Sequence, residues 1–306
     1  MPDGKLRPLI SIITPSYNQA AYLEATIRSV LEQDYSNIEY MVIDGGANDG
    51  SRDIIKRYAE HLAYWVSEAD EGQADAINKG FARASGKYVA WLNSDDVYRP
   101  GAVSRAVEML EADHELGLVY GQLDSIDAQG KVFNTITYQN YDLLDMLAFR
   151  IIGQPSVFMR RTVLDEAGSL DLGYKYLLDH HLWIRMAQQS KMTYVPEVWA
   201  AARHHESAKN VAQAAGFGAE AYRILEWAQG NPELASLIEQ NQRKVRAGAY
   251  RLDARYLLDG GEFSQSMRAY WQAFSQQPGY ALQHWKRILY ALAGVFGIAH
   301  WLDRLR

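Results

Sequence analysis

Two adjacent carboxylates, Asp95 and Asp96, follow the apolar run Tyr88–Leu92 almost directly. Hard divalent cations take oxygen ligands in proteins, usually one or two carboxylates together with phosphates of the substrate. The pair is therefore typical of a cation site at the end of a strand. A helix cap is the alternative, because Pro100 is expected to open a helix shortly afterwards.

A second polar cluster runs from Asp44 to Ser51, directly after the apolar run 40–43. Asp44 is the better candidate for a functional contact, because it is the first residue after the expected strand. The following Asn-Asp-Gly at 48–50 favours a turn with a helix cap. A calcium-binding loop is excluded, because Gly46 stands at a ligand position and Ile55 stands where a Glu is required.

Two later segments could also carry chemistry. Asp179 stands at the start of an expected helix that continues to Arg185. The helix dipole stabilises a carboxylate at the N-terminal end of a helix. A capping role is the alternative for this residue. The basic, imidazole-bearing loop from Arg203 to Lys209 could close on phosphates, and a polar linker is the alternative.

Alternating strands and helices are expected to position these side chains. Apolar runs at 9–13, 40–43, 62–66 and 88–92 alternate with helical patterns at 21–33, 51–60, 73–84 and 100–110. This alternation predicts a parallel sheet buried on both faces, which binds its ligand at the carboxyl ends of its strands. The segments 14–18, 44–46 and 93–96 should therefore face one crevice. Strands are also expected at 118–123 and 131–137, and helices beyond Val211.

Composition excludes several classes of protein. The 306 residues include no Cys, which excludes thiolate catalysis and Cys-ligated zinc. The net charge of −6 argues against a protein that coats nucleic acid. No Gly-x-Ser-x-Gly, His-Glu-x-x-His or Gly-x-Gly-x-x-Gly pattern occurs, so hydrolase, metalloprotease and dehydrogenase functions lose support. No apolar run reaches about 18 residues, and no apolar leader is present, so a cytoplasmic location is expected.

Taken together, these segments resemble family 2 glycosyltransferases of the GT-A fold. Six segments carry the resemblance, in this order: Ile12–Asn18, Met41–Ser51, Asp70–Gly80, Trp91–Asp96, Gln154–Arg161 and Leu178–Arg185. The similarity covers roughly residues 8–210. It implies an α/β catalytic domain at 1–210, with a mostly parallel, Rossmann-like sheet flanked by helices. An α-helical C-terminal region is expected at 211–306.

The resemblance implies a single inverting displacement on a nucleotide-diphosphate sugar, with a UDP-sugar favoured. Asp179 would act as the catalytic base, and Asp96, Asp95 and His205 would hold Mn²⁺ or Mg²⁺. The implied nucleotide contacts are Pro15, Tyr17, Asn18, Asp44, Asp75, Lys79, Asn93, Asp95 and Lys209. The implied contacts to the donor or acceptor sugar are Gln154, Trp183 and Asp179.

Two departures from the family pattern affect these expectations. The second strand commonly ends in Asp-Asp, whereas Gly45 follows Asp44 here. Nucleotide contact by a side chain at that position is lost, so that Asp44 or the backbone must serve. The catalytic segment often reads Glu-Asp, whereas Leu178 precedes Asp179, which leaves a single carboxylate there.

The expected acceptor is a saccharide or a lipid-linked molecule, in polysaccharide, O-antigen or glycolipid synthesis. Two other functions stay open: a non-catalytic carbohydrate- or nucleotide-binding protein on the same fold, and a nucleotidyltransferase. Retention of Asp95, Asp96 and Asp179 argues against the first. The absence of a Gly-rich basic loop after the first strand argues against the second.

Aromatic and basic residues alternate with apolar ones between Tyr280 and Arg306. This mixture suits a helix that lies in a membrane interface. Packing on the catalytic domain or on a second subunit is the alternative. We therefore expect either peripheral contact with the inner face of the membrane or a homo-oligomer through the C-terminal helices, and no nucleic-acid partner.

Overall fold

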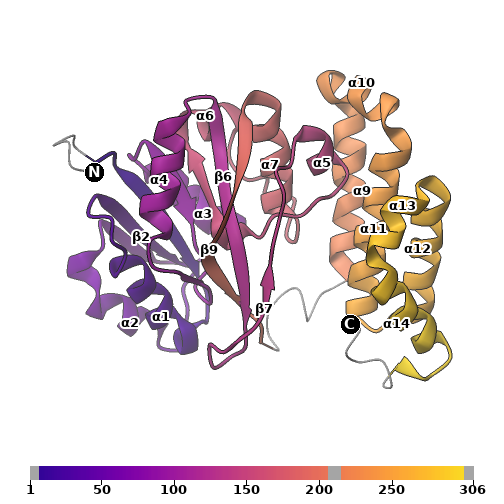
Figure 1. Ribbon diagram of the computed structural model, residues 1–306. Helices are drawn as coiled ribbons and strands as arrows, with labels where there is room; N and C mark the ends of the chain where they lie inside the picture. Colours follow the sequence, from indigo (N-terminus) through magenta and orange to yellow (C-terminus); the bar gives the residue numbers. More distant parts are fainter. Residues whose placement is uncertain (1–6, 206–214, 300–306) are drawn as a thin grey trace. The chain divides into compact units, whose positions relative to one another are not determined.

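A computed structural model describes residues 7–205 and 215–299 and divides the chain into two compact units. The α/β unit comprises residues 1–141 and 152–204, and the helical unit comprises 142–151 and 205–306 (Figure 1). The expected boundary between residues 210 and 211 lies outside the described residues. The assignment of residues 142–151 to the helical unit is a feature that the sequence did not predict.

A mixed sheet forms the centre of the α/β unit. In its described part the strand order is β3-β2-β1-β4-β8-β6-β9-β5, and β7 pairs with β6. The strands are β1 (Ile10–Ser16), β2 (Ile38–Asp44), β3 (Tyr64–Ser67), β4 (Tyr88–Trp91), β5 (Val97–Tyr98), β6 (Leu116–Ile126), β7 (Val132–Ile136), β8 (Val157–Arg160) and β9 (Lys191–Arg203). The expected parallel arrangement is found in β3, β2, β1 and β4. Antiparallel pairs with β8 extend the sheet beyond β4.

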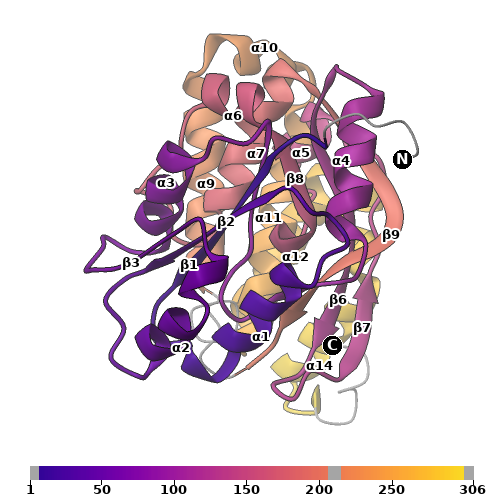
Figure 2. The same cartoon turned by 90° about the vertical axis from the view of Figure 1, so that its left-hand side faces the viewer.

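Helices cover both faces of this sheet. The helices of the α/β unit are α1 (Ala20–Leu31), α2 (Ser51–Arg57), α3 (Gln73–Arg83), α4 (Ala102–Ala112), α6 (Arg161–Ala167) and α7 (Leu178–Gln189). Alternation along the strands sends Ile12 into a core with α1, α2 and α4, whereas Trp91 contacts α3 and α7 on the other face. In Figure 2, α3 lies to the left of the strands and α4 to their right.

Helix α3 packs unusually close to β1 at Gly80. A Cβ atom at this position would lie 2.5 Å from Cγ2 of Ile13, which is closer than real side chains allow. We therefore expect Gly80→Val to lower the free energy of unfolding by about 1–3 kcal/mol through overpacking. Chemical denaturation would measure this loss. Gly230→Ala is the control, because nothing lies within 4 Å of its added Cβ. Equal stability of both variants would contradict the close approach.

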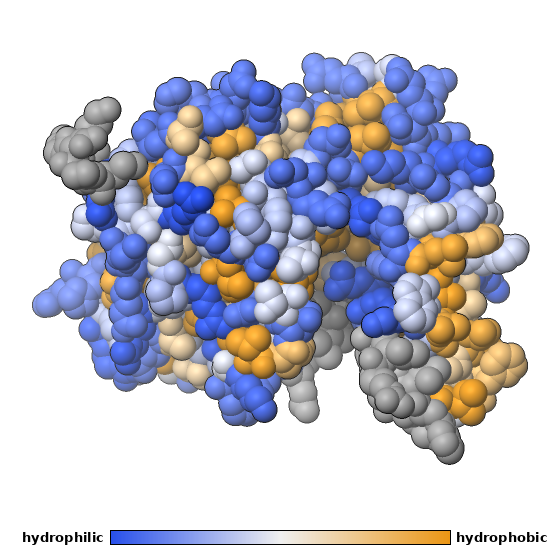
Figure 3. Space-filling view, viewed as in Figure 1, coloured by the Kyte–Doolittle hydropathy of each residue, from blue (hydrophilic) through white to orange (hydrophobic). Residues whose placement is uncertain are grey.

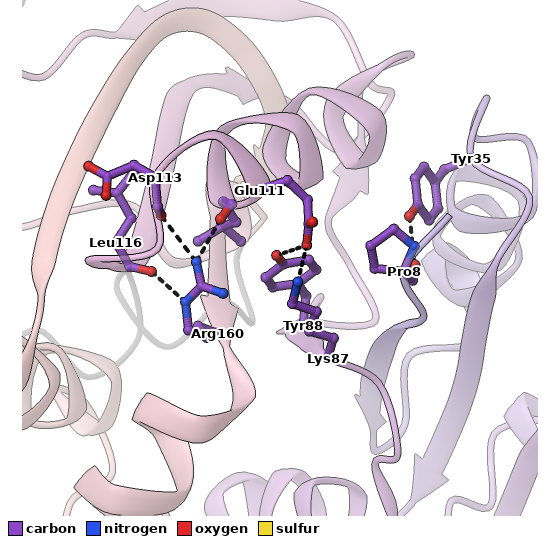
Figure 4. Close-up of polar contacts among 9 residues, drawn as sticks. Pro8, Tyr35, Lys87, Tyr88, Glu111, Asp113, Leu116 and Arg160 are labelled. Carbon is purple, nitrogen blue, oxygen red and sulfur yellow. Dashed lines mark hydrogen bonds and ion pairs between the residues drawn. The ribbon is translucent and has the colours of Figure 1, made fainter. Parts of the chain in front are cut away.

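Arg160, at the end of β8, fixes the loop between α4 and β6 (Figure 4). Its guanidinium group is buried and donates to the backbone carbonyls of Leu116 at 2.9 Å, Leu110 at 2.6 Å and Asp113 at 3.2 Å. Nearby, Lys87 and the hydroxyl of Tyr88 both contact the carboxylate of Glu111. Within the Gln154–Arg161 segment, Arg160 therefore has a structural role.

The helical unit confirms the expectation of helices beyond Val211 within the described residues. It contains α5 (Leu143–Leu147), α9 (Ala215–Gly230), α10 (Pro232–Gln240), α11 (Gln242–Asp259), α12 (Phe263–Gln276), α13 (Pro278–Ala281) and α14 (Trp285–Val295). The α5 segment is held by an ion pair between Asp145 and Lys244 at 2.9 Å and by a hydrogen bond from the Tyr280 hydroxyl to the Ala148 carbonyl at 2.8 Å. Among the described helices, none is long and apolar enough to cross a membrane.

His284 lies in a strongly positive part of the helical unit. Its Nδ1 is 3.3 Å from the hydroxyl of Tyr270. Burial, and then four nearby guanidinium groups, lower its pKa from 6.5 to about 2; they belong to Arg251, Arg255, Arg287 and Arg150. Asp259 forms ion pairs with Arg287 and Arg255. His284 is therefore neutral in the folded state at all ordinary pH values.

This lowered pKa predicts a loss of stability on acidification. Below the unfolded pKa of 6.5, only the unfolded chain takes up the proton, so stability present above that pH is lost as the pH falls. Between pH 7 and 5 the loss from His284 amounts to at most about 2 kcal/mol. Chemical denaturation at several pH values would measure it. His284→Gln should flatten this pH dependence, and an unchanged slope in that variant would contradict the assignment.

Candidate active site

The carboxyl ends of β1, β2 and β3 bring three polar side chains into one row. Ser16 is the register partner of Asp44, and Asp44 is the register partner of Ser67. Oδ2 of Asp44 accepts hydrogen bonds from the Ser67 hydroxyl at 2.7 Å and from the Ala47 amide at 3.0 Å. The row meets the expectation that strand ends position Asp44.

Asp44 keeps one acceptor without a protein donor. The residue is fully buried, yet no described residue donates a hydrogen bond to its Oδ1. The buried hydroxyl of the adjacent Ser16 also lacks a partner among the described residues. Buried polar atoms are normally paired, since an unpaired one costs about 1–3 kcal/mol. Two such atoms side by side therefore suggest a ligand that completes their hydrogen bonds.

The structure gives a physical reason for Gly45, the first departure from the family pattern. A Cβ atom at position 45 would lie 2.6 Å from Oδ2 of Asp70. Oδ1 of Asp70 accepts from the Gly72 amide at 2.9 Å. The Asp70 carboxylate thus stands beside Gly45, where a side chain at that position would begin. The sequence analysis did not identify Asp70 as a site residue, although it opens the matching segment 70–80.

The loops after β1 and β2 hold each other. The side chain of Asn18, which has a φ of 51°, accepts from the amide of Asn48 at 3.0 Å. Asp49 accepts from the amide of Ala20 at 2.8 Å and from the hydroxyl of Ser51 at 2.6 Å. Helix α2 begins at Ser51, directly after the expected turn, but its N-cap residue is Gly50, which provides no side-chain cap. Tyr17 lies exposed at the start of the loop after β1, while Pro15 is buried within β1.

Asp95 and Asp96 follow β4, and Asp96 is only 5% exposed. Its Oδ1 accepts from the backbone amide of Arg203 at 2.9 Å, and its Oδ2 accepts from the side chain of Asn93 at 3.3 Å. Burial, and then the charge of Asp95, raise the pKa of Asp96 well above its usual range. Burial and the neighbouring charge disfavour the anionic form of Asp96. A nearby cation would stabilise that form.

A chain of amide side chains orients Asp96. The Asn93 Oδ1 accepts from Gln73 at 2.7 Å, and its Nδ2 also donates to Oε1 of Gln154 at 3.2 Å. Nε2 of Gln154 in turn donates to the Trp91 carbonyl at 2.7 Å. Gln154 therefore positions Asn93, with both of its polar groups engaged in the protein. Gln73, the first residue of α3, is a site residue that the sequence analysis missed.

Asp75 and Lys79 pair with each other on α3 at 3.3 Å. Lys79 also lies 3.3 Å from Glu68, and Asp75 accepts from the amide of Glu71 at 3.1 Å. Both charged side chains therefore have partners within the protein. Contact of either residue with a nucleotide stays a prediction.

Helix α7 presents Asp179 in its first turn, as the sequence predicted. Oδ1 of Asp179 accepts from the amide of the next residue, His180, at 2.7 Å. Further along the helix, Arg185 donates to the carbonyls of Ala167 at 2.7 Å and Ser169 at 2.8 Å, which anchors α7 at the carboxyl end of α6. The side chain of Asn78 on α3 bonds in both directions with the backbone of Leu170. The loop before Asp179 is therefore tied to α3.

The structure corrects the expectation for Trp183. Its side chain is fully buried and stacks on Trp91, with ring centroids 5.2 Å apart. One turn of helix separates it from Asp179, but it points into the core between α7 and β4. Trp183 thus offers no surface to a sugar, and its effect on the site is to support the strand that carries Asp95 and Asp96.

Two expected residues at the end of the loop are not placed at the site. His205 belongs to the helical unit, and Lys209 lies outside the described residues. Among residues 7–205 and 215–299, no group of three or more His, Asp or Glu side chains is arranged to hold a metal ion. The predicted contribution of His205 and Lys209 stays a prediction.

Comparison with known proteins decides the family. The family profile described as Glycosyl transferase family 2 matches residues 11–168, which is half of the chain. The chain belongs to this family. An uncharacterized glycosyltransferase of Nostoc sp. is 38% identical over 174 residues, 53% of this chain and 54% of the relative. The match spans only about half of that relative's length.

Two further relatives also match only part of this chain and only part of their own length. An uncharacterized glycosyltransferase of Rickettsia prowazekii is 31% identical over 206 residues, 65% of this chain and 64% of the relative. The putative teichuronic acid biosynthesis glycosyltransferase TuaG of Bacillus subtilis is 39% identical over 109 residues, 34% of this chain and 42% of TuaG.

Solved structures show the GT-A fold of this family 2 glycosyltransferase. The mannosyltransferase PcManGT from Pyrobaculum calidifontis, in complex with GDP-Man and Mn²⁺, aligns with a TM-score of 0.63 at 20% identity, over 98% of this chain and 89% of that one. TarS 1–349 of S. aureus with UDP-GlcNAc aligns with a TM-score of 0.60 at 15% identity, over 97% and 90%. The expected fold class is confirmed.

Proposed function

We propose that this family 2 glycosyltransferase transfers a sugar, with inversion, from a nucleoside-diphosphate sugar to an acceptor hydroxyl. The observation that carries the proposal is the buried carboxylate of Asp96 beside the half-buried Asp95 after β4, in the same sheet whose ends carry Asp44. A phosphorylated ligand with a cation would satisfy this pair. The family membership supports the same reaction class.

The nucleotide base would bind at the ends of β1 and β2. The unpaired Oδ1 of Asp44 accepts a hydrogen bond, and the base edges of uracil and guanine both offer N–H donors. The Ser16 hydroxyl can donate or accept beside it. Tyr17 is 62% exposed, which leaves its ring available to stack on the base. A UDP-sugar is the favoured donor, and Asp70 provides the carboxylate that Gly45 does not.

The donor set at Asp95 and Asp96 fits a divalent cation, Mn²⁺ or Mg²⁺. Both ligands are carboxylates, and Asp96 is oriented by Asn93 and by the Arg203 amide. When bound, such a cation would supply positive charge that stabilises the departing diphosphate. His205 and Lys209 are the proposed additional contacts to the cation and the diphosphate.

Asp179 would take the proton from the acceptor hydroxyl as that oxygen attacks the anomeric carbon, while the bond to the diphosphate breaks. The transition state is then oxocarbenium-like, so that charge placement governs the rate. Anchoring supports this role, because Arg185 holds α7 and Asn78 holds the loop that precedes it.

The acceptor that we propose is a saccharide or lipid-linked saccharide of polysaccharide, O-antigen or glycolipid synthesis. The name of the B. subtilis relative, a putative teichuronic acid biosynthesis glycosyltransferase, supports an acceptor in polysaccharide synthesis. A cytoplasmic location at the inner face of the membrane would suit a lipid-linked acceptor.

A thermal-shift panel with Mn²⁺ and UDP-, GDP-, dTDP- and CDP-sugars tests the proposed donor class. We expect one nucleotide to raise the melting temperature, because ligand that binds only the folded state stabilises it by mass action. Asp44→Asn should weaken this stabilisation, while Asp34→Asn should not, because Asp34 is an exposed carboxylate in the segment after α1. No shift with any nucleotide would contradict the proposal.

A further inference from the structure

Helix α14 is apolar on two opposite sides. Its inner side packs in the helical unit through Tyr290 and Ala291, and Gly294 lies against the ring of Phe263. Its outer side carries an apolar stripe of four large residues, with exposed fractions of 42–71%: Trp285, Leu289, Leu292 and Phe296. The spacing of 4, 3 and 4 residues aligns them on one face. A surface helix of a globular protein normally carries polar residues on its solvent-facing side.

The neighbouring helix α12 adds one large exposed aromatic side chain to the apolar surface of α14. Its inner side is buried through Ala269, Tyr270 and Ala273, whereas Trp271 is 70% exposed and stacks on Phe274. Leu282, Val295 and Ile298 are also exposed in this part of the chain. Figure 3 shows apolar residues gathered on this side of the helical unit. Scattered apolar residues are normal on surfaces, but a contiguous group marks an interaction site.

Charge selects the kind of partner. The net charge of the chain is −6, yet the sequence from Phe263 to Ala299 contains no Asp or Glu. The same stretch contains Arg268, Lys286 and Arg287. Arg287 pairs with Asp259, whereas neither Arg268 nor Lys286 forms an ion pair with a described residue. The exposed surface of α12 and α14 therefore combines the apolar stripe with cations and uncharged polar residues and carries no carboxylate, which complements an anionic surface.

A second copy of the chain would fit this surface poorly. In a two-fold symmetric interface each patch meets the same patch of the other copy, so Arg268 and Lys286 would face a surface of like charge. No carboxylate in the stretch could compensate them. Anionic lipid headgroups would pair with these cations, while the Trp and Leu side chains would enter the apolar boundary beneath the headgroups.

We propose that the exposed faces of α12 and α14 bind an anionic lipid bilayer. The 11 residues of α14 extend about 16 Å, which is too short to cross the hydrocarbon core. The helix would thus lie along the interface, with its apolar stripe inserted and Lys286 at headgroup level. This role is separate from glycosyl transfer, because it uses no residue of the proposed catalytic site.

Flotation of the full chain with lipid vesicles tests this proposal without donor or acceptor, so that its outcome is independent of glycosyl transfer. The wild type should bind vesicles of phosphatidylcholine with phosphatidylglycerol, and bind vesicles of phosphatidylcholine alone more weakly. Trp285→Glu combined with Leu292→Glu should lower binding at least about tenfold. Arg268→Gln combined with Lys286→Gln should cost about fivefold for each charge, but only with anionic vesicles.

Phe133→Glu is the matched control, because Phe133 is 61% exposed on β7 of the α/β unit. This variant should bind vesicles like the wild type. Quenching of tryptophan fluorescence by brominated lipids in the wild type provides a second measurement that needs no variant. Absence of vesicle binding, or equal binding by all variants, would overturn the proposal. So would sedimentation that shows a dimer dissociated by the Trp285→Glu and Leu292→Glu changes.

Discussion

Asp179→Asn should abolish sugar transfer while nucleotide binding persists. The Asn side chain keeps the size of Asp and still accepts the hydrogen bond from the His180 amide, so the first turn of α7 should stay intact. It cannot take a proton from the acceptor hydroxyl. Loss of a general base lowers kcat by about 10²–10⁴-fold. Turnover and calorimetric nucleotide affinity, measured on the same preparation, separate the two effects.

Asp171→Asn is the matched control for this variant. Asp171 is an exposed carboxylate in the loop before α7, where it accepts from the amide of Gly173 at 2.8 Å. Transfer by the control should match the wild type. Undiminished transfer by Asp179→Asn, or an equal loss in both variants, would remove Asp179 from its proposed role.

The second large effect is expected for Asp96→Asn. The change removes a buried negative charge and retains an acceptor for the Arg203 amide, so that the end of β9 should stay in place. Without that charge the gain in nucleotide affinity from Mn²⁺ should disappear, a loss of at least about tenfold in Kd. Titration of the nucleoside diphosphate with and without Mn²⁺ measures this gain directly.

Asp124→Asn serves as the control for removal of a buried carboxylate. Asp124 is 8% exposed and forms an ion pair with Arg99 instead of belonging to the strand-end cluster. This control should lower stability but preserve the effect of Mn²⁺. An Mn²⁺ effect that survives in Asp96→Asn would contradict the proposed cation site.

The first four strands and their helices were predictable from sequence because their signals are local. Each strand is a short apolar run, and each helix has a regular apolar face, as in α1 with Leu23, Ile27 and Val30. The placement of Asp44 and the carboxylate pair at strand ends then followed from the rule for parallel sheets. These parts of the fold and site needed no long-range information.

Features that depend on contacts between distant segments could not be predicted. Buried and exposed residues do not alternate regularly along the 13 residues of β9. The pairing of β9 with β6 contains several register shifts, and each shift interrupts the alternation. The contact of Asp70 with Gly45 and the hydrogen bond from Gln73 to Asn93 join separate loops. The sugar contact of Trp183 was implied by the family resemblance, whereas the structure stacks its ring on Trp91 of a separate strand. The sequence gives residue types, but not which of them share a face across the sheet.

The phosphorus product of the reaction tests the proposed function most directly. The wild type with Mn²⁺, the stabilising nucleotide sugar and a soluble saccharide acceptor can be followed by ³¹P NMR. Inverting glycosyl transfer predicts that a nucleoside diphosphate accumulates, and that this signal is absent with Asp179→Asn. Release of pyrophosphate would instead indicate nucleotidyl transfer, and a nucleoside diphosphate that forms equally in Asp179→Asn would contradict the proposed mechanism.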